Sequence, residues 1–289
     1  MKIAAFNIQK FGQKKLSDPD VMKTLIRIVS RYDIVVILEV VEKKGKAIDR
    51  FLEELNKANP KNPYSKKISV RLGRTTYKEQ FLFLYRGAVV NVIGTYQYED
   101  NQCGDEDAFD REPYILRFSC PNTVMQDLVL VPVHTKPEDS EKELDELYDV
   151  VLAVRDKWKT DHIMILGDFN ADGSYVSKKE MKAIRIYKDA DFHWLIRDKV
   201  DTTTSTKNDH TYDRIVVYGE NTLDAIVPNS ARAFNFQQEY GLTEADALKV
   251  SDHYPVEVEL KLSNGDGQSK QLNSLFVHPS STYDLIYNT

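Results

Sequence analysis

Residues 162–176 read HIMILGDFNADGSYV, and in this stretch an apolar run gives way to polar side chains. The run Ile163–Leu166 has the continuous apolar pattern of a strand that is covered on both faces. Asp168 and Asn170 follow directly beyond it. Because a single Asp after a strand is more often a turn residue than a ligand, this ending indicates a functional site only if other strands end in the same way.

Other β-rich runs recur along the chain, at Ile3–Phe6, Ile34–Leu38, Phe81–Tyr85, Tyr114–Phe118, Leu128–Val133, Ile215–Val217 and Tyr254–Leu260. The motif VEVEL (256–260) alternates apolar and charged residues, which predicts a half-exposed strand. Helical patterns cover 21–30, 47–57 and 138–158, and the last of these places Leu152 on its apolar face. Strands in mixed order with helices between them predict an α/β fold in which two packed mixed sheets are flanked by helices.

The composition is that of one ordinary globular domain. Of the 289 residues, 42% are hydrophobic and 29% are charged, and no apolar run approaches the roughly 18 residues of a membrane span. We expect one domain over residues 1–262 and a flexible polar tail over 263–289. The net charge of −6 argues against a protein that binds nucleic acid mainly by counterion release. It leaves open an enzyme that meets phosphate through a bound metal ion.

Three features predict the cellular location. The chain starts with KIAAFNIQ, which has the pattern of a strand and not that of a secretory leader. It contains no Asn-x-Ser/Thr acceptor, and its two cysteines are Cys103 and Cys120. We expect an intracellular protein, cytoplasmic or nuclear, with two buried thiols. A bridge between the cysteines, and secretion of a chain whose leader was removed, stay open as alternatives.

Side chains able to do chemistry lie at the ends of several of these runs. Four runs end in such a side chain and two begin with one: Asn7, Glu39, His134 and the pair Asp168 and Asn170 follow their runs, whereas Asp213 and the pair Asp252 and His253 precede theirs. If the first four strands run one way and the last two the other, all of these groups meet at one edge of the sandwich. A repeated pattern of this kind indicates one site.

Acidic side chains at that edge would require a positive charge between them. Four carboxylates would meet there: Glu39, Asp168, Asp213 and Asp252. Like charges raise one another's pKa, and an all-oxygen ligand set favours Mg2+, Mn2+ or Ca2+ over Zn2+. Two histidines at the same edge would supply proton transfer near neutral pH. The remaining histidines are assigned ordinary structural roles: His162, His193, His210 and His278.

The series of motifs resembles the deoxyribonuclease I family, within the endonuclease/exonuclease/phosphatase superfamily. It runs from Lys2 to about Lys261 and consists of KIAAFNIQ, SRYDIVVILEV, LGRTTYKEQF, FDREPYILRF, VPVHTKPEDSEKELDELYDV, ILGDFNADGSYV, TYDRIVV and VSDHYPVEVEL. GDFN or SDHYP alone would indicate the superfamily, but the whole series in this order is specific. The resemblance implies a four-layered α/β/β/α sandwich with its site in a groove at one sheet edge.

The resemblance also implies an activity. The chain would be a metal-dependent endonuclease that hydrolyses DNA phosphodiester bonds with little sequence specificity and leaves 5′-phosphate and 3′-hydroxyl ends. Glu39, with Asp168 and Asp252 nearby, would hold a catalytic Mg2+ or Mn2+ ion. Asn7 and Asn170 would bind the scissile phosphate by hydrogen bonds.

Acid and base roles follow from the same resemblance. His134 would be paired with Glu79, and His253 would be oriented by Asp213. We assign His253 as the base that activates water and His134 as the acid at the leaving 3′ oxygen. The reverse assignment stays open.

The resemblance further implies contacts with DNA. Arg111 would contact phosphate, and Tyr77, Tyr175 and Tyr212 would line the groove. Such groups respond to the width and flexibility of the minor groove more than to base identity. Val41 stands where the family carries an arginine that enters the minor groove, so we expect weaker or differently placed contact.

Structural Ca2+ sites and a disulfide are the last features that the resemblance implies. One calcium site of the family is matched by Asp107, the carbonyl of Phe109 and Glu112. A second is matched by Asp201 and Thr203, in a loop that is one residue longer than the corresponding loop of the family. The long-range disulfide of the family would join the segments that here read ADGSYV and NDHTYDR, and neither contains a cysteine. Its absence suits a reducing compartment, or means that the stability is found elsewhere.

Two rival functions stay open. A phosphodiesterase or phosphatase acting on a small or lipid phosphate shares the fold, and Tyr77, Arg111 and Tyr175 argue against it. A catalytically silent binding protein is disfavoured because no matched catalytic position is substituted. We expect a monomer whose partner is double-stranded DNA, with no membrane binding. Actin binding is not expected, since the segment before LGR reads KKISVR.

Overall fold

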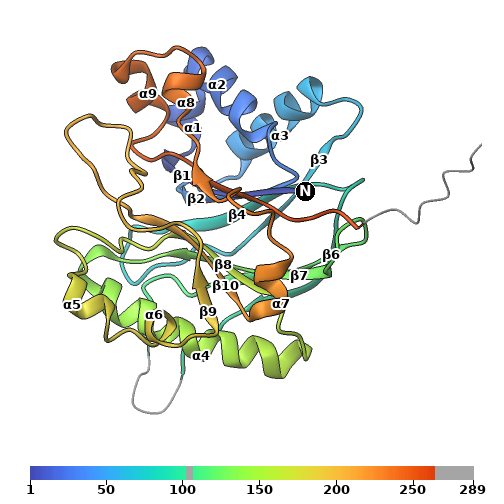
Figure 1. Ribbon diagram of the computed structural model, residues 1–289. Helices are drawn as coiled ribbons and strands as arrows, with labels where there is room; N and C mark the ends of the chain where they lie inside the picture. Colours follow the sequence, from blue (N-terminus) through green and yellow to red (C-terminus); the bar gives the residue numbers. More distant parts are fainter. Residues whose placement is uncertain (102–106, 264–289) are drawn as a thin grey trace, which may run out of the picture.

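Two sheets pack face to face, and helices cover both outer faces (Figure 1). The structure is a computed structural model that describes residues 1–101 and 107–263. From top to bottom, Figure 1 shows helices, a sheet, a second sheet and further helices. The four-layered α/β/β/α sandwich expected from the sequence is therefore confirmed. Among the described residues, no helix is long and apolar enough to cross a membrane.

The first sheet has the strand order β11-β12-β1-β2-β4-β3. Its strands are β1 (Lys2–Phe11), β2 (Ile34–Val40), β3 (Tyr64–Ile68), β4 (Gln80–Arg86), β11 (Arg232–Ala233) and β12 (Val256–Glu259). β1 and β2 are parallel, and β12 is antiparallel to β1. The helices on its outer face are α1 (Gln13–Leu16), α2 (Pro19–Val29), α3 (Lys46–Ala58), α8 (Phe236–Glu239) and α9 (Glu244–Val250).

The second sheet has the strand order β5-β6-β7-β8-β10-β9. Its strands are β5 (Asn91–Gln97), β6 (Tyr114–Cys120), β7 (Gln126–His134), β8 (Ile163–Asp168), β9 (Phe192–Trp194) and β10 (Asp213–Tyr218). A 3-10 turn (Pro137–Asp139) leads into the long helix α4 (Ser140–Trp158). The other helices of this half of the molecule are α5 (Lys178–Met181), α6 (Arg185–Lys188) and α7 (Glu220–Asp224). β7 and β8 are parallel and β10 is antiparallel to β8, so the strand directions on which the predicted convergence depends are confirmed.

The strand VEVEL is half-exposed at Glu259, as predicted, but not at Glu257. Glu257 of β12 is only 4% exposed, because the helical layer covers the outer face of the first sheet. It accepts a hydrogen bond of 2.6 Å from the Tyr32 hydroxyl and pairs with Arg31 at 3.1 Å. A buried charge is retained when it is paired in this way. Leu152 is a second correction, since it is 43% exposed and the neighbouring Val150 is buried in its place.

Some predictions concern residues outside the described part of the chain. Cys103, His278 and the tail from residue 264 onwards lie there. Cys120 is described and is a buried free thiol. Burial raises its pKa to about 12, so this thiol is unreactive near neutral pH.

Gly167 sets the distance between β7 and β8. Its φ is +143°, and a Cβ atom at this position would lie 2.0 Å from the carbonyl oxygen of Val133. The β7 backbone therefore passes directly against this residue, where a side chain cannot fit. The same register places Val133 opposite Gly167 and His134 opposite Asp168. Gly167 thus allows His134 and Asp168 to lie side by side at the ends of β7 and β8.

Gly167→Ala should destabilise the fold by about 3 kcal/mol or more, because the methyl group adds a backbone clash to an unfavourable φ. Urea denaturation measures the free energy of unfolding. Gly241→Ala is the matched control, since its φ of +62° is also positive but its Cβ would meet nothing within 4 Å. The control should cost about 1 kcal/mol. Equal costs for the two variants would contradict the explanation from backbone contact.

Candidate active site

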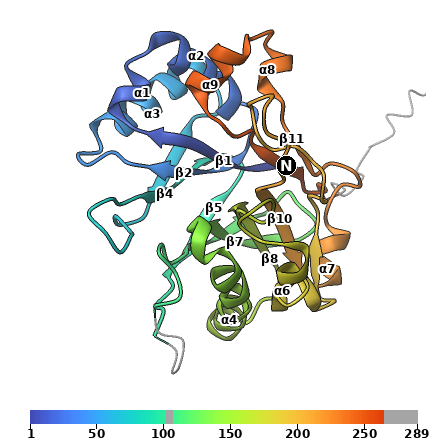
Figure 2. The same cartoon turned by 90° about the vertical axis from the view of Figure 1, so that its left-hand side faces the viewer.

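Strand register brings the predicted residues to one edge of the sandwich. In the second sheet, His134 and Asp213 both lie opposite Asp168. In the first sheet, Asn7 pairs with Leu38, and Glu39 is the next residue along β2. Figure 2 turns this edge toward the viewer, with β1 and β2 above β7 and β8. The predicted convergence of strand ends is therefore present in the structure.

Two histidines, each bound to its own carboxylate, face each other across Asp168. Nδ1 of His134 lies 2.7 Å from Oε2 of Glu79, and Nδ1 of His253 lies 2.8 Å from Oδ2 of Asp213. Both Nε2 atoms lie 3.6 Å from the same atom, Oδ2 of Asp168. Since each carboxylate fixes one ring nitrogen, both free nitrogens are directed at one centre.

Amide groups hold Asp168 in place. Asn7 Nδ2 donates to Oδ2 of Asp168 at 3.0 Å, and the backbone N–H of Asn170 donates to its Oδ1 at 3.1 Å. Asn170 adopts a left-handed φ of +47°, and its Nδ2 donates to the carbonyl of Thr135 at 3.0 Å. Both predicted asparagines are at the site, but in this structure their amide groups bind the protein. Their contact with a phosphate stays a prediction.

Burial and neighbouring charges together determine the ionisation of the site. Burial would lower the pKa of both histidines, but their carboxylates outweigh it and raise the pKa, for His253 well above its usual range. For Asp213 burial outweighs its histidine, and its pKa rises to about 6. For Glu79, burial is outweighed by His134 and Arg111, so its pKa falls. These carboxylates therefore favour the protonated form of both histidines, which suits the role of acid, whereas the role of base requires the neutral form, which positive charge near Asp168 favours.

Two acids at this edge lack full compensation by the protein. Burial raises the pKa of Glu39, and like-charged neighbours add to the effect. Oδ1 of Asp252 is buried and has no hydrogen-bond partner among the described residues. Asp168, Asp213 and His253 each offer one ligand atom within 4.8 Å of the others. A buried carboxylate oxygen without a hydrogen bond and a cluster of mainly hard oxygen donors fit a divalent cation.

Arg111 lies in the wall of the site. Its guanidinium donates to the carbonyl of His134 at 3.0 and 3.2 Å and lies 3.3 Å from Oε2 of Glu79. The side chain is only 7% exposed. In the structure Arg111 therefore binds His134 and Glu79. Its predicted contact with phosphate stays a prediction.

Glu143 of α4 joins two segments of this wall. Its Oε1 accepts the backbone N–H of Asp110 at 3.3 Å and that of Lys136 at 3.1 Å. One of these segments carries Arg111 and the other follows His134. Burial raises the pKa of Glu143 to about 7. No sequence pattern indicated this role, because the residue acts through backbone groups of distant segments.

Aromatic side chains flank the site on two sides. Tyr77 is 45% exposed, and its hydroxyl lies 3.5 Å from Oε1 of Glu39. Tyr175 is 41% exposed, and its ring centroid lies 5.4 Å from that of Tyr212. His210 stacks on Tyr212 at 4.9 Å, which agrees with a structural role for this histidine. The tyrosines expected to line a groove thus lie on both sides of the catalytic candidates.

The two predicted calcium sets lie on separate loops. Asp107 and Glu112 line one surface hollow, and Phe109 lies between them in the chain with its side chain buried. Oδ1 of Asp201 accepts the backbone N–H and the hydroxyl of Thr203, at 2.9 and 2.7 Å. The first set therefore shares an accessible space, whereas in the second the two residues bond to each other.

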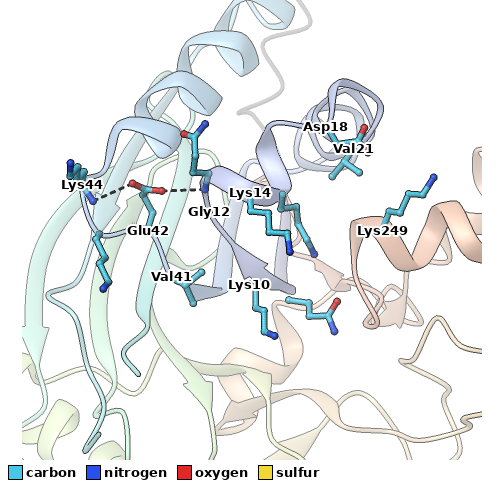
Figure 3. A pocket seen from close by; sticks show the side chains of 13 residues that line it. Lys10, Gly12, Lys14, Asp18, Val21, Val41, Glu42, Lys44 and Lys249 are labelled. Carbon is cyan, nitrogen blue, oxygen red and sulfur yellow. Dashed lines mark hydrogen bonds between the residues drawn. The ribbon is translucent and has the colours of Figure 1, made fainter. Parts of the chain in front are cut away.

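Sequence reasoning missed a group of lysines beside the site. A hollow of about 750 Å³ adjoins Gln9, and its lysines are Lys10, Lys14, Lys15, Lys43, Lys44 and Lys249. Four of them are labelled in Figure 3: Lys10 of β1, Lys14 of α1, Lys44 of the segment after β2, and Lys249 of α9. The basic runs QKFGQKK (9–15) and EKKGK (42–46) carry a signal that could have indicated this lysine hollow.

Comparisons with known proteins agree on one family. The model of the Endonuclease/Exonuclease/phosphatase family matches residues 4–253. Deoxyribonuclease gamma of Homo sapiens is 42% identical, over 94% of this chain and 89% of its own. Deoxyribonuclease-1 of Sus scrofa is 46% identical, over 90% and 92%. The human Nocturnin catalytic domain superposes with a TM-score of 0.61 at 14% identity, covering 91% of this chain and 94% of its own, which supports the fold alone.

Glu143→Gln should change how stability depends on pH. The folded chain holds the Glu143 proton more tightly than the unfolded chain, because burial raises the pKa from 4.5 to about 7. The contribution of this group to stability therefore falls as the pH rises through that window. The variant keeps an acceptor oxygen but does not ionise. Its free energy of unfolding, measured by urea denaturation, should rise relative to the parent between about pH 5 and about pH 8.

The control for this experiment is Glu141→Gln, an exposed position on the same helix. Its stability relative to the parent should not depend on pH in the same window. A difference between Glu143→Gln and the parent that stays constant with pH would show that burial does not perturb this carboxyl group.

Proposed function

We propose, from the premise that this chain belongs to the Endonuclease/Exonuclease/phosphatase family, that it is a metal-dependent endonuclease hydrolysing DNA with little sequence specificity. One observation carries the proposal: two carboxylate-bound histidines direct their free nitrogens at Asp168, each at 3.6 Å. Such a pair can remove a proton from an attacking water and give another to a leaving oxygen. The relatives named deoxyribonucleases support DNA as the substrate.

In the proposed reaction, water attacks the phosphorus in line with the leaving 3′ oxygen. His253, oriented by Asp213, takes a proton from this water as the new P–O bond forms. His134, oriented by Glu79, gives a proton to the 3′ oxygen as its bond to phosphorus breaks. The products are a 5′-phosphate and a 3′-hydroxyl, and exchanging the roles of the two histidines gives the same products.

Glu39, Asp168 and Asp252 would hold a divalent cation, for which we propose Mg2+ or Mn2+. When bound, the ion supplies positive charge that stabilises the phosphoryl oxygens during attack. Asn7 uses its Nδ2 atom to bind Asp168, and the second proton on that nitrogen would serve a phosphate oxygen. Asn170 would reach phosphate after leaving its bond to the Thr135 carbonyl.

Double-stranded DNA would lie across the side chains that flank the site. Tyr77 and Tyr175 are both exposed, one on each side. The lysine hollow places positive charge near Val41, where the resemblance would put an arginine. Phosphate binding by Lys10 and Lys14 would then compensate in part for the arginine that Val41 replaces. Cutting should follow the shape of the duplex and not a fixed sequence.

A structural Ca2+ ion is proposed for Asp107 and Glu112. Burial raises the pKa of Glu112, and Asp107 adds to the effect, so a nearby cation would be stabilising. Nε of Arg74 lies 3.1 Å from Asp107 and supplies part of that charge. Asp201 and Thr203 are a weaker candidate because they satisfy each other.

For partners and location, we propose a monomer that binds neither actin nor a membrane and that acts in the cytoplasm or nucleus. Within the fold, hydrolysis of a small or lipid phosphate is the rival activity, and a silent binding protein is the rival class. Nicking of supercoiled plasmid separates these alternatives.

Purified protein should nick supercoiled plasmid in Mg2+ with Ca2+, and EDTA should abolish nicking. His253→Ala should lower the rate by roughly 10²- to 10⁴-fold, because the variant cannot transfer a proton at this position. Agarose gels with a time course measure the conversion to open circles.

His162→Ala is the matched control for the nicking experiment. His162 also binds a carboxylate through Nδ1, at 2.8 Å from Asp127, but at the opposite end of β7 and β8. It should keep the parental rate. Folded parent protein that does not nick, or an equal fall in rate in both variants, would overturn the nuclease proposal and favour one of the rivals.

Replacing Lys10, Lys14 and Lys44 together by Gln should weaken DNA binding. The slope of log K against log salt should shrink by about one for each phosphate that the variant no longer binds. Fluorescence anisotropy with a labelled duplex in EDTA measures the slope without cleavage. Lys61→Gln is the control, since this exposed lysine follows α3 at the far end of the first sheet. An unchanged slope in the folded triple variant would remove the lysine hollow from the DNA path.

A further inference from the structure

β1 leaves its regular pairing just where it reaches the site. It pairs with β12 over Lys2–Ala5, and its register with β2 breaks between Asn7 and Phe11. Gln9 and Lys10 have positive φ values of 28° and 54°. Backbone carbonyls in such a segment need other partners, because an unpaired buried carbonyl costs free energy.

Lys15 supplies one of these partners. Its Nζ donates to the carbonyl of Ile8 at 3.0 Å and to the carbonyl of Val250 at 2.6 Å. Ile8 follows Asn7 on β1, and Val250 ends α9 just before the segment Ser251, Asp252 and His253. One ammonium group thus joins the irregular part of β1 to the segment that carries the proposed base.

A second bond runs parallel to this one. The Ser251 hydroxyl donates to the carbonyl of Asn7 at 2.6 Å and accepts the backbone N–H of His253 at 3.0 Å. The carbonyls of Asn7 and Ile8, which are neighbours on β1, are therefore held by Ser251 and Lys15. Gln9 completes the connection, since its Nε2 donates to Oδ2 of Asp252 at 3.0 Å.

We propose that Lys15 is a positioning residue, whose ammonium group holds the Asp252–His253 segment against β1 in the geometry that hydrolysis requires. Unlike the exposed Lys10 and Lys14 of the lysine hollow, Lys15 is half-buried, and its ammonium group is bound to the carbonyls of Ile8 and Val250, so it acts through the backbone and not on the substrate. Burial lowers its pKa to about 8 although Asp252 and Glu39 oppose this shift, which agrees with a charge enclosed beside the site. The inference rests on the proposed function.

A positioning role predicts a particular kinetic pattern. A displacement of about 1 Å at a reacting group can cost on the order of 10²-fold in rate. Other segments bind the rest of the DNA, so the KM for DNA should hardly change. A displaced segment therefore lowers kcat and leaves KM near its parental value.

Lys15→Met is the first variant, because it keeps the length of the side chain and removes the ammonium group. Its kcat for plasmid nicking should fall about 10- to 100-fold, with KM within about threefold of the parent. Lys15→Cys treated with 2-bromoethylamine restores an ammonium at the same distance from the backbone and should recover kcat. Parent protein given the same treatment controls for modification of the native cysteines.

Lys23→Met is the matched control, since Lys23 is an exposed lysine on α2 and the change removes the same charge. It should keep both kinetic constants. Parental kcat in Lys15→Met, or a rise in KM alone, would overturn the positioning role. If Lys15→Met does not fold, Lys15→Arg decides, because its longer side chain should keep the fold but shift the segment and lower kcat severalfold. Parental kcat in folded Lys15→Arg would then reduce Lys15 to a residue needed for folding alone.

A separate measurement distinguishes this inference from the proposed function. Mg2+ or Mn2+ without DNA should raise the thermal midpoint of the parent, and this rise should be smaller in Lys15→Met, because Asp252 belongs to the displaced segment. If the parent does not nick plasmid, the proposed function fails, and the thermal shift still tests Lys15 by itself. An equal shift in parent and variant would then overturn the inference.

Discussion

Asp168 is shared between two histidines, and the whole site depends on the register that puts it there. β8 lies between β7 and β10, so the end of one strand meets His134 and Asp213 together. A slip of one residue in either pairing would turn a side chain to the other face of the sheet. Gly167 fixes the contact with β7, because no side chain fits against Val133. The glycine before the aspartate is therefore as necessary to the geometry as the aspartate.

The site concentrates negative charge in a chain that is already acidic, and most of that charge is balanced locally. Glu79 is balanced by His134 and Arg111, while Asp213 faces His253. The least compensated groups are Glu39, whose pKa is raised by burial, and Oδ1 of Asp252, which accepts no hydrogen bond among the described residues and lies 3.8 Å from Nε2 of His253. The sequence shows how many acids reach this edge but not which of them have partners. It therefore predicts that a cation is needed, whereas the choice of ligands requires the structure.

The central strands could be predicted from the sequence, and the edge strands could not. β3, β5, β9 and β11 escaped prediction, and they are the four edges of the two sheets. A central strand is covered on both faces and has a largely apolar sequence, while an edge strand such as β5 is partly exposed and mixed in composition. The same reason applies at the site. Residues at strand ends follow from strand direction, but Lys15 and Glu143 bind backbone groups far along the chain, and no local pattern records such contacts.

The two loops that close the site are joined by polar bonds at the place where the resemblance implies a disulfide. Asp172 accepts the backbone N–H of Thr211 at 2.8 Å, and Arg214 donates to the carbonyls of Ala171 at 3.1 Å and Thr211 at 2.9 Å. Hydrogen bonds to charged groups contribute about 1.5–3 kcal/mol each, so the two that cross between the loops, Thr211 to Asp172 and Arg214 to Ala171, are comparable to the roughly 3–4 kcal/mol of a loop-closing disulfide. A thiol reductant cleaves a disulfide but does not break these hydrogen bonds. The edge that carries Asp168 and Asp213 is therefore held in the same way under reducing and oxidising conditions, and the absence of cysteines from these loops requires no change in the fold.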